Sequence, residues 1–121
     1  MEISEIVSDL LGNLEEQLGD DIGTIRTFAS SQGKKLAAQA KLIAEQRVAG
    51  VLRDDDELFE HFVQSLKDAA ENFARSVVML TVLTIEKAWN AIVNAIWGAL
   101  NGILQGAGLP SVFIPGPPSV N

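Results

Sequence analysis

The sequence contains no cysteine and a single histidine, His61. Without cysteine the chain can form no disulfide, no thiolate zinc site, no iron–sulfur site and no cysteine nucleophile. One histidine leaves no dyad or triad in which histidine is the base. The sequence also has no glycine-rich phosphate loop, no nucleophile elbow and no dinucleotide-binding fingerprint. We therefore predict that the protein is not an enzyme and has no catalytic residue, cofactor or metal site.

Charged residues are absent after Lys87, and before it they fall into blocks of one sign. Residues 1–21 carry seven acids and no base, residues 22–53 carry six bases and one acid, and residues 54–87 carry eight acids and three bases. The blocks sum to a net charge of -7. Such a field repels polyanions, so we predict that the protein does not bind nucleic acid. Blocks of opposite sign favour antiparallel neighbours within or between chains.

Proline is absent before residue 110, and all four prolines lie in a C-terminal tail, residues 107–121. Proline lacks an amide donor and fixes φ, so we predict that this tail is extended and not helical. The middle of the tail is apolar. We interpret it as an arm that docks on a neighbouring chain by peptide addition, with a frayed chain end as the alternative. The docking residues are Leu109, Val112, Phe113 and Ile114.

Two amphipathic helices that form a hairpin-like region are predicted in residues 1–53. Apolar residues recur at steps of three and four over residues 2–18, which indicates an amphipathic helix that ends at Gly19. A second helix is expected from about Ile22 to Val51, with a thin apolar stripe. Ser30, Ser31 and Gly33 form a soft spot where this second helix can bend or break.

The region 54–106 is predicted to form one long helix, with room for a bend. Asp54 and Glu57 have the spacing of a capping box, and no proline or strong break follows before Gly106. About 50 residues at about 1.5 Å each would make a rod of roughly 75 Å. A compact globule of 121 residues has no room for such a rod. An extended and oligomeric all-α architecture is therefore favoured over a compact monomer.

The acids at the start of this long helix, together with His61, include the residue types of a metal site. The pattern lacks the later ligands and the glycine turn of an EF-hand loop. A di-iron bundle would need a second histidine. We interpret these acids as caps that offset the helix dipole.

The second half of the long helix carries a continuous apolar seam beside a row of small residues. Four successive tetrads begin at Trp89, Val93, Trp97 and Asn101. A period of four aligns glycines along one ridge, where a second backbone can approach closely. We predict a homo-oligomer interface on this face. Its residues are Val82, Ile85, Trp89, Ile92, Ile96, Gly98, Leu100, Gly102 and Ile103.

The uncharged stretch allows a second interpretation, in which residues 76–109 insert into a membrane. Asn90, Asn94 and Asn101 argue against insertion because each is costly in lipid unless it is paired. No lysine or arginine follows Lys87 to fix the far side. The N-terminus is acidic where a signal peptide is basic, so we expect no signal peptide and a location in the cytoplasm or in a virion.

No motif defines a family. The general build, a small cysteine-free helical chain with a long seam helix and an uncharged proline-rich arm, is similar to accessory structural proteins of bacteriophage virions, although no residues are aligned. This likeness implies a tail, neck or capsid component. Our hypothesis is a non-enzymatic structural subunit that self-associates through the long helix and docks its arm on neighbouring chains of a larger complex. The alternatives are the membrane-active protein and an antitoxin-like adaptor that binds one protein partner through its acidic helices.

Overall fold

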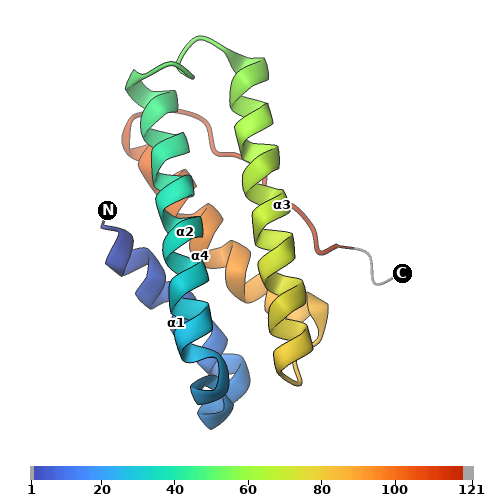
Figure 1. The fold of residues 1–121 in the computed structure, drawn as a ribbon. Helices are drawn as coiled ribbons and strands as arrows, with labels where there is room; N and C mark the ends of the chain where they lie inside the picture. Colours follow the sequence, from blue (N-terminus) through green and yellow to red (C-terminus); the bar gives the residue numbers. More distant parts are fainter. Residues whose placement is uncertain (1, 119–121) are drawn as a thin grey trace.

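The computed structural model describes residues 2–118. Within them the regular structure is entirely helical, which confirms the predicted all-α class (Figure 1). The elements are α1 (Ile3–Leu18), the 3-10 turn η1 (Gly19–Asp21), α2 (Ile22–Ala49), α3 (Asp56–Leu80) and α4 (Ile85–Gly106). Residue 1 of the region 1–53 and residues 119–121 of the predicted docking tail lie outside the described residues.

The first two helices lie where the apolar period places them. Gly19 ends α1 with φ 59°, a left-handed conformation that favours glycine, and its N–H donates to the carbonyl of Glu15. The soft spot does not break α2. A Cβ on Gly33 would lie 2.7 Å from Cδ2 of Leu10, so glycine here lets α2 pack closely against α1.

The single long helix predicted over residues 54–106 is corrected to two helices. The chain leaves the helix after Leu80 and re-enters one at Ile85. The Thr81 hydroxyl donates to the carbonyl of Val77 at 2.7 Å and accepts from the N–H of Leu83 at 3.2 Å. The Thr84 hydroxyl then caps α4 by accepting from the N–H of Lys87 at 3.3 Å. These hydroxyls satisfy backbone groups that the helix ends leave free, which makes the break possible without proline or glycine.

A second correction concerns the start of α3. The capping carboxylate belongs to Asp55, which accepts from the N–H of Leu58 at 2.9 Å, and not to Asp54. Arg47 at the end of α2 holds the turn that precedes α3. Its guanidinium lies 4.4 Å from the ring centroid of Phe59 and donates to the carboxylate of Asp56 at 2.7 Å.

The helices pack as a central pair, α2 and α4, with α1 and α3 against it. Both α1 and α3 contact α2 and α4, and over the described residues α1 and α3 do not contact each other. Figure 1 shows α4 crossing behind α2 and α3. The accessible surface is 6747 Å², close to the roughly 6,300 Å² expected of a compact chain of this mass. The expectation of an extended chain is therefore wrong, because the break at residues 81–84 lets the two halves of the predicted rod fold side by side.

Candidate functional site

The C-terminal segment, residues 107–118, turns back over α4 as soon as that helix ends. Gly108 adopts φ 78°, and its N–H donates to the carbonyl of Gln105 at 3.0 Å. The N–H of Leu109 donates to the carbonyl of Leu104 at 2.9 Å. These two bonds form a Schellman cap, whose left-handed residue is usually glycine. The cap reverses the chain so that the segment runs back along the helix.

Polar side chains of α4 hold this segment in place. The Asn101 amide donates to the carbonyl of Val112 at 3.0 Å and accepts from the N–H of the same residue at 2.7 Å. The indole Nε1 of Trp89 donates to the carbonyl of Pro115 at 3.0 Å. Because Asn101 pairs with both polar groups of one residue, it fixes the register of the segment on α4.

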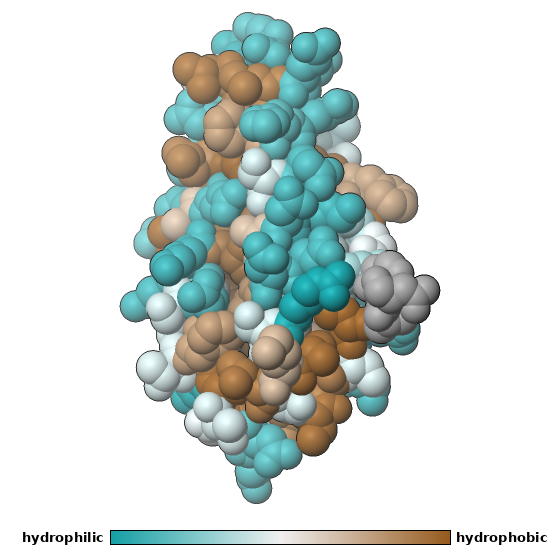
Figure 2. Space-filling view, turned by 45° about the vertical axis from the view of Figure 1, so that its right-hand side comes forward, coloured by the Kyte–Doolittle hydropathy of each residue, from teal (hydrophilic) through white to brown (hydrophobic). Residues whose placement is uncertain are grey.

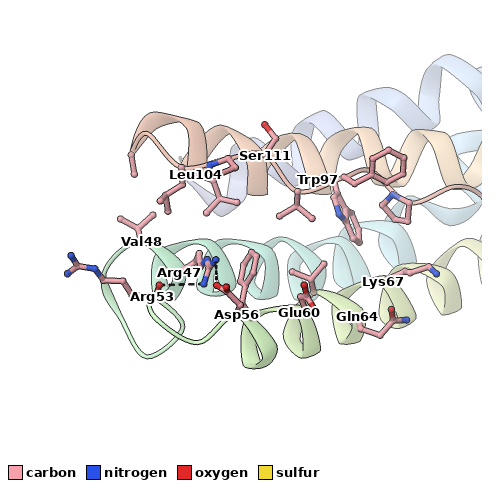
Figure 3. A pocket seen from close by; sticks show the side chains of 18 of the residues that line it. Arg47, Val48, Arg53, Asp56, Glu60, Gln64, Lys67, Trp97, Leu104 and Ser111 are labelled. Carbon is pink, nitrogen blue, oxygen red and sulfur yellow. Dashed lines mark hydrogen bonds and ion pairs between the residues drawn. The ribbon is translucent and has the colours of Figure 1, made fainter.

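An open groove of about 1160 Å³ lies between this segment and α3 (Figure 3). One wall is α3, the other is formed by α4 with the segment, and the end of α2 also contributes. The groove is of the size that takes ligands or side chains of a partner. The apolar side chains that line it include Phe59, Val63, Trp97, Leu104, Val112 and Phe113.

The charges around the groove cancel, although the whole chain is acidic. Three bases and three acids line it: Arg47, Arg53, Lys67, Asp54, Asp56 and Glu60. Arg47 and Asp56 pair with each other. Within residues 2–118, Glu60 and Lys67 form no ion pair, and Figure 3 shows both on α3 with Gln64 between them. The groove is thus framed by opposite charges that are free to meet charges on another chain.

Trp97 supplies an unpaired polar group at the groove wall. Its side chain is fully buried, and its indole Nε1 has no hydrogen-bond partner among the described residues. Figure 3 shows this side chain reaching from α4 toward α3. A buried donor without a partner costs about 1–3 kcal/mol. An acceptor brought to this wall would remove that cost.

The nine residues predicted as an oligomer interface separate into two sets. Ile85, Trp89, Ile92, Ile96 and Leu100 are buried in the chain's own core. The prediction is corrected for these five, because α1, α2 and α3 of the same chain pack around α4 and cover its seam. Val82, Gly98 and Gly102 are exposed and Ile103 is half-buried, so they can still contact a second chain.

The four residues predicted to dock on a neighbour also separate. Leu109 and Val112 pack against the core of their own chain. For these two the prediction is corrected, because the Schellman cap and Asn101 bind the arm to its own α4. Phe113 and Ile114 face solvent, and Phe113 is 89% exposed. The outer side of the arm therefore remains available to a partner.

A second exposed apolar patch lies where α3 turns into α4, at the far end of α3 from the groove. Met79 and Val82 are each 86% exposed, and Leu80 lies between them in the sequence. Asp21 and Thr24 line a shallow hollow beside this patch. Figure 2 shows apolar atoms gathered on the lower part of the molecule, at the height of this turn in Figure 1.

The range 76–109, predicted as a possible inserted helix, comprises the end of α3, the turn, α4 and the first residues of the segment. No helix within residues 2–118 combines the length and the apolar character needed to cross a bilayer. In the same part of the chain, no three histidine, aspartate or glutamate side chains gather where they could share a metal ion.

Sequence reasoning missed Asn101 and Trp89 as the polar anchors of the C-terminal segment. A signal for Asn101 was present. It opens the fourth tetrad, whereas Trp89, Val93 and Trp97 open the others, so one polar residue interrupts an apolar series. A buried or half-buried amide needs hydrogen-bond partners, and the C-terminal segment supplies them. Which tryptophan would find a partner depends on the path of the segment and could not be read from the sequence.

Together, the helices and the returning segment form a small helical bundle with an open groove whose lining combines apolar side chains with equal numbers of acids and bases. Comparisons of this chain with models of protein families, with curated proteins and with solved structures find no match.

Proposed function

We propose that the protein is a non-enzymatic structural subunit that self-associates and joins larger protein assemblies through the face that carries the groove and Phe113. The exposure of Phe113 supports this proposal most strongly. Its side chain is 89% exposed, yet its backbone lies between two anchored residues, Val112 and Pro115. Large aromatic side chains are common interface anchors, and a segment that is fixed in advance loses less entropy on binding.

In this proposal the C-terminal segment is still a docking element, as predicted from the sequence. The main contact with another chain is made at the groove and Phe113 and not at the seam of α4. That seam is covered by the chain's own helices, whereas Phe113, Ile114 and the groove remain open. A contact at Phe113 and Ile114 requires no rearrangement of the core, because both side chains are already exposed. Membership in a virion, which the likeness of general build implies, stays a prediction.

The test is the molar mass of the purified full chain, measured by light scattering from micromolar to millimolar concentration. We expect the mass to rise above the 13.0 kDa of one chain as concentration increases. The variant Phe113→Ser/Ile114→Ser should remain at the mass of one chain. The matched control Met79→Ser/Val82→Ser, which removes two exposed apolar side chains at the other end of α3, should behave as the wild type.

A wild-type chain that keeps the mass of a monomer at every concentration contradicts the proposal. A control that loses self-association while the Phe113 variant retains it would move the interface to the α3–α4 turn.

A further inference from the structure

We infer that the chain docked on this face is a second copy of the protein, related by a two-fold axis, and that Phe113 of each copy enters the groove of the other. This inference rests on the proposed self-association and specifies the partner and the contact. Three features support it: the position of Phe113, the arrangement of charges along α3, and the unpaired Trp97 indole.

The position of Phe113 suits a two-fold interface. Phe113 lies at the edge of the groove and projects into solvent. A two-fold axis brings the same surface patch together from both chains, so a patch must complement itself. A patch that carries a projecting ring beside an apolar hollow meets this condition, because each ring can fill the hollow of the other chain.

The charges along α3 also complement themselves. Glu60 and Lys67 lie on the same side of α3, two turns or about 10.5 Å apart, and both line the groove. A two-fold axis perpendicular to α3 places a second α3 antiparallel to the first. Glu60 then lies opposite the partner's Lys67, and Lys67 opposite the partner's Glu60. The lining of the groove carries equal numbers of acids and bases, so two copies that meet at this face add no net charge repulsion there.

The Trp97 indole gives the contact a polar component. Its N–H is buried at the groove wall without a partner. In the same helix, Trp89 donates to a backbone carbonyl of the C-terminal segment. The partner's segment carries carbonyls of the same kind next to its Phe113. When the partner's ring enters the groove, the side chains at the wall move aside. A carbonyl next to that ring then accepts the hydrogen bond from Nε1 of Trp97.

Charge reversal on α3 tests the two-fold arrangement. Glu60→Lys alone and Lys67→Glu alone each place like charges opposite one another in both halves of the dimer. In sedimentation equilibrium of the full chain at low salt, we expect either change to raise the dissociation constant at least about threefold. The double variant Glu60→Lys/Lys67→Glu should return to within about twofold of the wild type, because the pairs are restored with their signs exchanged.

Two controls match the change in net charge. Glu5→Lys on α1 and Lys35→Glu on α2 alter exposed residues outside the groove, and neither should weaken the dimer as its counterpart on α3 does. At a protein concentration where the wild type is monomeric, the thermal unfolding of every variant should match the wild type, since the reversed residues lie at the surface.

Phe113→Ser tests the apolar component, and it should weaken the dimer about tenfold or more, while Met79→Ser should change it less than about twofold. Two results would overturn the inference while the proposed function stands, provided that the wild type self-associates. One is a double variant Glu60→Lys/Lys67→Glu whose dimer is as weak as those of the single variants, and the other is a Phe113→Ser variant whose dimer is unchanged. If the wild type remains monomeric, both the inference and the proposed function are overturned.

Discussion

The two tryptophans of α4 share a helix and full burial but differ in their hydrogen bonds. Nε1 of Trp89 donates to the carbonyl of Pro115, whereas Nε1 of Trp97 has no partner within residues 2–118. The difference arises from the C-terminal segment, which covers Trp89 and leaves a groove beside Trp97. The part of α4 around Trp89 is therefore covered by the segment, which stabilises the monomer. The part around Trp97 borders the open groove, where we expect association.

The largest effect should come from removing either ring. Trp89→Ala and Trp97→Ala should each lower the free energy of unfolding by about 3–5 kcal/mol, because both side chains are fully buried. Urea denaturation measures this loss. Similar losses would show that the two tryptophans differ in polar contacts and not in packing. A loss below about 1 kcal/mol for Trp97→Ala, the size of an average substitution, would mean that its ring is not part of the core.

The next effect should come from releasing the C-terminal segment. Asn101→Ala removes two hydrogen bonds to Val112 and should cost about 1–2 kcal/mol in the docking of the segment. Hydrogen exchange at the Val112 amide and proteolysis within residues 109–118 should both become faster. Asn94→Ala, at an exposed position of the same helix, is the control and should leave both rates unchanged.

A smaller effect isolates the indole hydrogen bond. Trp89→Phe and Trp97→Phe remove similar volumes, but only Trp89→Phe removes a hydrogen bond that the structure contains. We expect Trp89→Phe to cost about 0.5–1.5 kcal/mol more than Trp97→Phe in urea denaturation at low protein concentration. Equal costs would contradict the assigned difference between the two sites.

The smallest effect concerns the row of small residues on α4. A Cβ on Gly98 meets no atom within 4 Å, so Gly98→Ala should raise the free energy of unfolding by about 0.5–1 kcal/mol through helix propensity. Gly33→Ala is the control and should bring no such gain, because its Cβ meets Leu10. Self-association should be unchanged by Gly98→Ala. Weaker association of Gly98→Ala would indicate that the row of small residues on α4 forms the interface.

Local patterns predicted the helical class, the position of α1 and the path of α2, because each depends on spacing and on caps such as Gly19 that act within one segment. The apolar seam of α4 was also recognised. The apolar spacing did not show what covers this seam. A helix packed in its own chain and a helix packed against another chain have the same spacing.

The break between α3 and α4 could not be predicted from the sequence for a different reason. Thr81 and Thr84 are visible in the sequence, and Thr84 is a favourable N-cap residue. Threonine is also tolerated within helices, so it marks a possible end without requiring one. The groove depends on this break and on the return of the segment to Asn101, two long-range features that no single segment of sequence encodes.

The most direct test of the account is the ¹H–¹⁵N NMR spectrum of the two indole groups during dilution of the full chain from millimolar to micromolar concentration. Trp89→Phe and Trp97→Phe assign the two signals. We predict that the Trp97 signal shifts with dilution as its acceptor from the second copy is lost, while the Trp89 signal stays in place. A change in mass that leaves the Trp97 signal unmoved, or that shifts Trp89 instead, would contradict the placement of the interface at the groove.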